Sequence, residues 1–183
     1  DKDSYFWLTG RKKELIIRGG HNIDPATIEE PLYTMREIKT VAAVGRPDKY
    51  AGEVPVAYVQ LVDDAALSEN QIIEYARNHI SERAAVPKEI VIIDEIPLTT
   101  VGKIFKPALR RDAIKRVFEK ELAKLQTCCS GVRVTVEEHQ KYGDLVIITV
   151  DSNDGMDIEK THQQIKEAVS GYTVAFELKH HTL

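Results

Sequence analysis

The chain contains 183 residues with a formal net charge of −4, and its 43% hydrophobic and 30% charged residues are ordinary for a globular protein. The negative charge argues against a general binder of nucleic acids or anionic membranes. No apolar run approaches the roughly 20 residues of a membrane span and no secretion signal opens the chain, so we expect a cytoplasmic protein with neither a membrane span nor a nucleic-acid partner.

The opening of the chain predicts a small β-structure. Tyr5–Leu8 and Glu14–Arg18 read as two short strands around the basic turn Thr9–Lys13. Gly19-Gly20 ends this stretch, since paired glycines accept backbone angles that other residues resist. The patterned sequence starts almost at once after Asp1–Ser4, without an initiator Met, so we expect the chain to be part of a longer protein.

A helix is predicted directly afterwards. Asp24 is a typical N-cap residue, and Pro25 suits the first helical position because its φ is already helical. Pro31 lies inside the continuation, so this helix should be short or kinked near Glu30.

The middle of the chain alternates predicted strands with helices. Thr40–Val44 and Val56–Val62 read as buried strands, separated by the turn-rich segments Gly45–Asp48 and Ala51–Glu53. A helix should follow, with apolar residues at helical spacing: Ile72, Ile73, Ala76 and Ile80.

Capping and amphipathic patterns complete this part of the chain. Ser68 and Gln71 form a capping box at the start of that helix. Glu89–Asp94 is another short β-branched run. From Pro107 onward a long amphipathic helix presents one apolar face: Leu109, Ile114, Val117, Phe118, Leu122 and Leu125. This order predicts a compact α+β domain with small sheets flanked by helices over residues 1–126.

The composition shifts at Thr127–Gly131, and a small extension of unknown role follows over residues 127–183. Its predicted strands are three short runs: Val132–Val136, Leu145–Val150 and Val174–Leu178. The first two form a hairpin closed near Tyr142–Asp144, and a helix over Asp157–Ser170 has Gly171 as its C-terminal cap. A β-β-α-β unit of about 55 residues is close to the lower limit for independent folding, so it should pack on the first domain.

The cysteines and the last histidines carry no clear site. Cys128 and Cys129 are adjacent, which fits no metal or redox spacing and would strain a disulfide, so we expect free thiols. His180 and His181 lack a third ligand, so we read them as a solvated tail and expect no metal site.

The sharpest local signal is Pro97–Ile104, which contains the pair Gly102-Lys103. A P-loop would need glycine in place of Pro97 and Ser or Thr in place of Ile104, so that interpretation fails. What remains is Lys103 on a glycine-hinged loop between a strand and a helix, where its ammonium group can reach an anion in another domain. Taken alone, such a lysine is more often an ordinary surface residue.

A second signal is Thr9–Pro25, which joins a basic turn, a strand, a Gly-Gly pair and a capped helix. Taken alone, this segment would be a tight hairpin with solvated charges. Together with Pro97–Ile104, in this order and separation, it resembles the core motifs of the adenylate-forming superfamily, which includes acyl-CoA synthetases. Val41–Asp48 and Gly52–Val59 also resemble the usual sequence of that family. The resemblance covers residues 1 to about 125 but not 127–183.

The resemblance implies that this domain is the C-terminal lid of a ligase. In this family a carboxylic acid attacks the α-phosphate of ATP to give an acyl-adenylate, and the thiol of CoA then attacks the acyl carbon. The lid rotates between the two steps. ATP and CoA are therefore the expected cosubstrates, with Mg²⁺ bound outside this chain. The expected partners are an N-terminal adenylation domain of the same parent protein and a carboxylic acid.

The resemblance also implies roles for single residues. Lys103 corresponds to the catalytic lysine of adenylate formation, and Lys13 falls at the hinge. Arg11 and Asn22 are the implied nucleotide-binding residues, although Asn22 stands where relatives carry other polar residues and cannot neutralise phosphate. Gly19, Gly20 and His21 would line the pantetheine tunnel of CoA.

Three alternatives stay open at this point. A peptide-synthetase adenylation domain is disfavoured, because no Gly-Gly-x-Ser-like carrier site follows in residues 127–183. Luciferase-type oxidation is compatible with the lid. A non-catalytic binding or regulatory module that kept the lid fold is the rival from another class, and retention of Lys103, Arg11 and the glycine pair together favours the enzyme.

Overall fold

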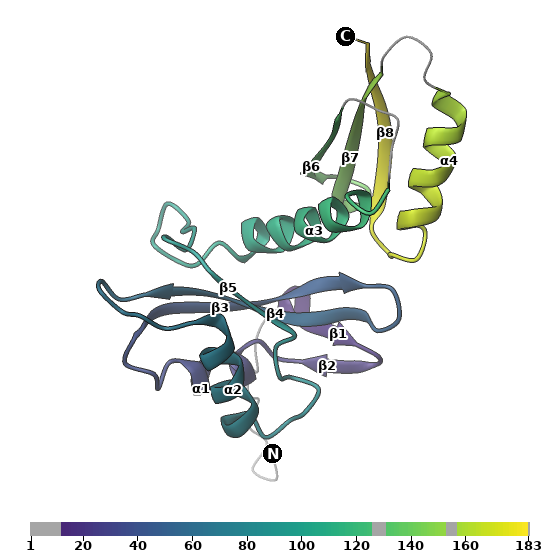
Figure 1. Ribbon diagram of the computed structural model, residues 1–183. Helices are drawn as coiled ribbons and strands as arrows, with labels where there is room; N and C mark the ends of the chain where they lie inside the picture. The colour runs from purple at the N-terminus through teal and green to yellow at the C-terminus, as the bar shows by residue number, and fades with distance from the viewer. Residues whose placement is uncertain (1–11, 126–130, 153–156, 183) are drawn as a thin grey trace. The chain divides into compact units, whose positions relative to one another are not determined.

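The computed structural model describes residues 12–125, 131–152 and 157–182 (Figure 1). These residues form four α-helices and two β-sheets, which confirms the predicted α+β class. The structure divides into two compact units. Of the described residues, the first unit holds 12–45 and 54–106, and the second holds 46–53 together with those from 107 onward.

The sheet of the first unit has the strand order β2-β1-β4-β3, and β5 pairs in parallel with β4. Its strands are β1 (Ile16–Arg18), β2 (His21–Ile23), β3 (Ile38–Asp48), β4 (Gly52–Leu61) and β5 (Glu89–Ile92). β3 and β4 are longer than predicted. Val41–Val44 and Val54–Val59 are buried along them. The predicted turn segments Gly45–Asp48 and Ala51–Glu53 belong largely to the strands, which leaves Lys49–Ala51 between them.

Helices α1 (Ala26–Leu32) and α2 (Glu69–His79) lie side by side against this sheet (Figure 1). Their apolar faces enter one core with the strands, through four fully buried side chains: Ile28, Leu32, Ile72 and Ala76. The capping box of α2 is present, since Ser68 Oγ accepts from the Gln71 amide and Gln71 Oε1 accepts from the Ser68 amide. α1 ends at Leu32, one residue after Pro31, as a helix of seven residues, which confirms the expectation of a short helix.

The start of the first unit differs from the sequence prediction. Residues 12–14 form a 3-10 helix, and the strand begins only at Ile16, while Tyr5–Leu8 lies outside the described residues. Pro25 already has helical dihedral angles and occupies the cap position that was predicted for Asp24. The Asp24 carboxylate nevertheless accepts a hydrogen bond from the Ala26 amide at 3.0 Å, so the predicted capping by Asp24 is present and only the helix boundary differs by one residue.

The second unit is built from α3 (Lys106–Leu122) beyond its first residue, the sheet β6-β7-β8 and α4 (Ile158–Val169). β6 (Gly131–His139) and β7 (Gly143–Ser152) form an antiparallel hairpin, and β8 (Ala175–Thr182) runs parallel to β7. The predicted β-β-α-β order is therefore confirmed. One core joins both helices to the sheet, and its fully buried members include Phe118, Val146, Ile148, Val150 and Ile165.

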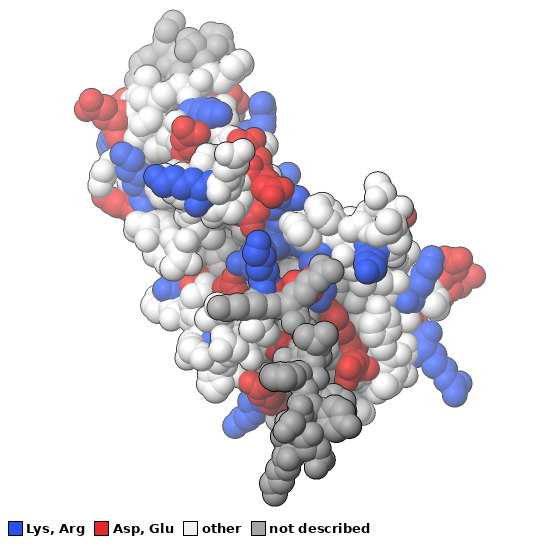
Figure 2. All heavy atoms as spheres, turned by 180° about the vertical axis from the view of Figure 1, so that it is seen from behind, with Lys and Arg blue, Asp and Glu red and all other residues white. Residues whose placement is uncertain are grey.

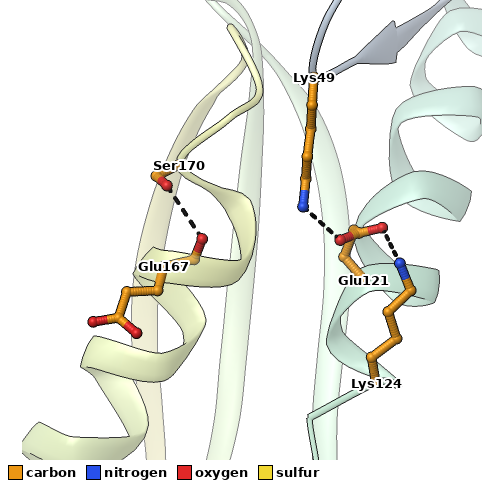
Figure 3. A network of polar contacts seen from close by, with 5 residues as sticks. All are labelled: Lys49, Glu121, Lys124, Glu167 and Ser170. Atoms are coloured by element: carbon orange, nitrogen blue, oxygen red, sulfur yellow. Dashed lines mark hydrogen bonds and ion pairs between the residues drawn. The ribbon is translucent and has the colours of Figure 1, made fainter.

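The tip of the β3–β4 hairpin, residues 46–53, belongs to this second unit and is held there by a polar network (Figure 3). Lys49 Nζ lies 2.7 Å from a carboxylate oxygen of Glu121, which also binds Lys124. Burial alone would raise the pKa of Glu121, but the hydrogen bonds and charges of Lys124 and Lys49 outweigh it and lower that pKa. Lys49 also lies over the ring of Tyr172, whose pKa rises to about 12 because of burial and the neighbouring Glu121.

Two expectations for the extension are wrong in detail. Gly171 does not adopt the left-handed conformation of a C-terminal cap; Ser170 occupies the cap position, and Gly171 packs against the side chain of Lys49. His180 and His181 are not a tail, because they pair with Val150 and Asp151 as part of β8. Strand pairing extends through the histidines because β7 provides a partner strand, which the sequence pattern alone does not reveal.

The boundary at residue 126 stays a prediction. α3, which lies before that boundary, shares its core with β6, β7 and α4. The expected free thiols, Cys128 and Cys129, lie outside the described residues.

On the face drawn in Figure 2, basic and acidic side chains are interspersed.

Candidate functional site

The loop that carries Lys103 is a closed turn at the end of the first unit. Leu98 and Ile104 form an antiparallel bridge, and the Phe105 amide donates to the Pro97 carbonyl oxygen at 2.7 Å. Gly102 has a φ of +77°, a conformation that side-chain-bearing residues rarely adopt. The turn therefore needs glycine at the position directly before Lys103.

Hydrogen bonds inside the turn hold the backbone of Lys103 itself. Its carbonyl oxygen accepts from the Thr99 amide at 2.7 Å, and its own amide donates to Thr99 Oγ1 at 3.1 Å. The side chain is exposed, as are those of Leu98 and Val101 beside it. A fixed backbone with an exposed ammonium group is the arrangement needed to present positive charge to an anion outside this domain.

The glycine pair forms the two-residue turn of the β1–β2 hairpin. Arg18 pairs with His21, so Gly19 and Gly20 are the two central residues, with φ values of +55° and +88°. Both angles are positive, as a type I′ hairpin turn requires. A Cβ atom on either glycine would meet no atom within 4 Å, so the space over the turn is open. His21 and Asn22 follow on β2 with exposed side chains.

A basic surface hollow of about 460 Å³ lies in the same unit. Its charged lining residues are Arg18, Arg77, Arg83 and Lys88, and its apolar walls come from Ile73, Ile80, Val86 and Pro87. Arg18 directly precedes Gly19 and is fixed by a 2.6 Å hydrogen bond from its guanidinium group to the Ala84 carbonyl oxygen. The sequence alone does not reveal this cluster, because its cations come from β1, α2 and the loop after α2, which are far apart along the chain.

The hinge candidate Lys13 lies in the 3-10 helix Lys12–Glu14 with an exposed side chain. Its neighbour Glu14 forms an ion pair with Lys106, whose Nζ is 3.5 Å from Glu14 Oε2 and 2.8 Å from Glu29 Oε1. The same oxygen of Glu29 accepts a hydrogen bond from the Ala43 amide at 2.7 Å. Lys106, the last residue of the first unit, therefore pairs with the residue directly after Lys13.

The remaining predicted positions divide into described and undescribed residues. Arg11 lies outside the described residues. Lys103, in the loop before α3, and Gly19, Gly20 and His21, in the β1–β2 hairpin, stand on two separate elements of the first unit. Within the part of the chain that the structure describes, no group of three or more His, Cys, Asp or Glu side chains could hold a metal ion. The described helices include none that is long and apolar enough to cross a membrane.

Comparison with known proteins relates this geometry to a family. Residues 27–103, which end at the lysine of the closed turn, match the model of the AMP-binding enzyme C-terminal domain. This chain carries an AMP-binding enzyme C-terminal domain. Apart from the hairpin tip 46–53, the matched residues belong to the first unit, so the domain contains the helices α1 and α2, most of the sheet and the turn before Lys103.

The curated relatives of this chain include acid–CoA ligases. The chain is 47% identical over 148 residues to marinolic acid–CoA ligase of Pseudoalteromonas sp. (strain SANK 73390), covering 81% of this chain and 22% of that protein. It is 40% identical over 121 residues to indoleacetate–CoA ligase of Aromatoleum aromaticum (strain DSM 19018 / LMG 30748 / EbN1), covering 66% of this chain and 24% of that protein. The first match is longer than residues 1–126, so it includes part of the extension.

Solved structures also match this chain. A Mycobacterium tuberculosis fatty acyl CoA synthetase matches with a TM-score of 0.53 and 35% sequence identity, over 61% of this chain and 22% of that one. The chain thus spans less than a quarter of the length of the relatives it matches.

Proposed function

We propose that this chain is the mobile lid of an ATP-dependent, AMP-forming acyl-CoA ligase that activates a carboxylic acid and transfers it to CoA. The proposal rests on two features that lie in the first unit: an exposed lysine on a rigid turn, and an open glycine turn beside a basic hollow. These two features suit the two half-reactions. The rival, a non-catalytic module with the same fold, would not need both.

In the first half-reaction, a carboxylate oxygen of the acid forms a bond to the α-phosphorus of ATP, and the bond to the bridging oxygen breaks to release pyrophosphate. Lys103 would bring its ammonium group to the reacting carboxylate and phosphate oxygens and offset the negative charge that grows between them. The closed turn holds the lysine backbone in place beforehand, so less reorganisation is needed when the lid closes.

In the second half-reaction, the sulfur of CoA attacks the acyl carbon of the adenylate and AMP leaves. The pantetheine arm of CoA would pass over Gly19 and Gly20, where no side chain projects. The basic hollow begins at Arg18, next to this turn, and its four cations suit the phosphate groups of the CoA nucleotide. His21 would lie along the pantetheine path, and Asn22 would donate or accept hydrogen bonds near the nucleotide.

The remaining parts of the active site belong to the longer parent protein. An N-terminal adenylation domain would bind ATP with its Mg²⁺ and would contain the acid pocket. The exposed Lys103 turn and Arg11 would contact the nucleotide from the lid side, and Lys13 would be the pivot between the two poses. The isolated 183-residue chain would therefore be inactive, and its cytoplasmic location remains a prediction.

The decisive experiment is an assay of the full-length parent for acid-dependent ATP–pyrophosphate exchange across a panel of short, aromatic and long-chain acids. Exchange that depends on one class of acid, followed by thioester formation when CoA is added, would support the proposal. Binding of ligands without exchange for any acid would favour the non-catalytic module. The isolated chain provides the matched negative control.

A further inference from the structure

Lys106 is the third residue after Lys103 and the first residue of α3, so it lies at the base of the proposed catalytic turn. Its side chain turns back into the first unit. Nζ contacts Glu29 at 2.8 Å and Glu14 at 3.5 Å, and the side chain retains only 16% of its exposure. An ammonium group this far withdrawn from water, next to two carboxylates, forms a stronger pair than a surface lysine does.

Each carboxylate belongs to a different part of the proposed machinery. Glu29, on α1, is itself fixed by the hydrogen bond from the Ala43 amide of β3, and its side chain is 17% exposed. Glu14 directly follows the hinge candidate Lys13 and is 32% exposed. The inner pair therefore anchors Lys106 to the core of the unit, while the outer pair reaches the hinge segment.

We propose that Lys106 is a positioning residue that ties the turn carrying Lys103 to α1 through Glu29 and to the hinge segment through Glu14. It would act through Lys103 and touch no substrate. This role rests on the proposed ligase function. Without the anchor, the backbone of the turn would still close on itself, but its base at Phe105 would move relative to the core, and the Lys103 ammonium group would spend less time in the reactive position.

The first test uses the 183-residue chain and needs no activity. Four amides report on the turn, because each donates a hydrogen bond within it: Thr99, Gly102, Lys103 and Phe105. Lys106→Met should increase their hydrogen-exchange rates by about tenfold or more, since it leaves two carboxylates uncompensated at the base of the turn. Lys115→Met is the matched control, because it removes a lysine of the same helix whose pair with Glu119 is half exposed, and it should leave the four rates unchanged.

If Lys106→Met does not fold, Glu29→Gln tests the same anchor from the other side and should increase the exchange of the same four amides. Equal exchange in wild type and in a folded anchor variant would overturn the positioning role, whatever the activity.

The second test uses the full-length parent. Lys106→Met should lower kcat of adenylate formation by about tenfold or more, as a misplaced catalytic group does, with little change in KM for ATP, and Lys106→Arg should restore part of it. The effects of Lys106→Met and Glu14→Gln on this rate should not add, because the two residues share one ion pair. Additive effects would overturn the link to the hinge. A wild-type parent without exchange for any acid would overturn the proposed function, and the role of Lys106 in catalysis with it, even where the amide measurement shows the anchor.

Discussion

The guanidinium group of Arg18 donates a 2.6 Å hydrogen bond to the carbonyl oxygen of Ala84. This bond ties the strand before the Gly19–Gly20 turn to the loop after α2, where Arg83 and Lys88 lie. The open glycine turn and the basic hollow are therefore neighbouring parts of one surface. That surface is the most informative place to test how the domain meets CoA.

The positive charge of the hollow should affect the KM for CoA but not the KM for pantetheine, the part of CoA without the nucleotide phosphates. In the full-length parent, Arg83→Gln should raise KM for CoA by about tenfold, the effect of losing one charge-assisted contact. With pantetheine as the acceptor, which lacks the nucleotide phosphates, the same variant should match wild type. An equal rise in KM for both acceptors would remove Arg83 from phosphate binding.

Gly20→Leu should block thioester formation while leaving pyrophosphate exchange nearly intact, because a branched side chain would project into the open space over the turn. At a φ of +88° leucine also strains the backbone, so the control must carry the same strain. Gly143→Leu does so, since Gly143 closes the β6–β7 hairpin with a φ of +79° and has equally open space around its Cβ position. Separate kinetics of the two half-reactions measure the effect; normal thioester formation in Gly20→Leu would remove this glycine from the CoA path.

Lys103→Ala should lower the rate of adenylate formation by about 100-fold or more, the usual loss when a transition-state charge is removed. Thioester formation from a supplied acyl-adenylate should stay near wild type, because the lysine serves only the first step. Both half-reactions are measured on the full-length parent by pyrophosphate exchange and by CoA-dependent consumption of adenylate. Equal losses in both would contradict the assignment of separate lid faces to the two steps.

Lys13→Pro should confine the lid to one pose. The structure has Lys13 in a 3-10 helix, whose φ is close to the value that proline imposes, so proline at this position should favour this local conformation over any that a pivot would need. We expect adenylate formation to persist and thioester formation to fall by about 100-fold. Pre-steady-state kinetics measure both steps, with circular dichroism as the folding control and Lys13→Ala as the variant that keeps the backbone free. Wild-type rates in a folded Lys13→Pro protein would show that the pivot lies elsewhere.

The histidine pair of the second unit predicts a pH-dependent stability. His162 stacks on His180 with ring centroids 4.4 Å apart, and its buried Nε2 has no hydrogen-bond partner. Burial, together with the charges of His180 and Lys166, lowers the pKa of His162 from its ordinary value of 6.5. The unfolded chain then binds more protons than the folded one, so the free energy of unfolding should fall as the pH drops below 6.5 and level off below the folded pKa.

His162→Phe tests this expectation, because phenylalanine keeps the ring stacking and removes the titration. Urea unfolding of the 183-residue chain between pH 7.5 and about pH 5 should show a smaller loss of stability in the variant than in wild type. His139→Phe is the control, a change of the same kind on β6. An unchanged pH dependence in His162→Phe would contradict the assignment.

Short-range chemistry determined what could be predicted from the sequence. The capping box of Ser68 and Gln71, the glycine turn before β2 and the Gly102-Lys103 turn were identified because each depends on residues a few positions apart. The order of the β-β-α-β extension followed from alternation and helical spacing in the same way. The resemblance added the roles of Lys103, Lys13 and Gly19–His21, which remain proposals.

Only the tertiary structure decided which distant residues meet. The tip of the β3–β4 hairpin joins the second unit through Lys49 and Glu121, which are 72 positions apart, and no local pattern predicts that pairing. Arg18 and the cations after α2 form one hollow because β1 and that loop pack together. Lys106 reads as an ordinary helix-start residue until folding buries its side chain between Glu14 and Glu29. A sequence shows which groups are charged, but only the folded core withdraws particular charges from water and so makes their pairing strong.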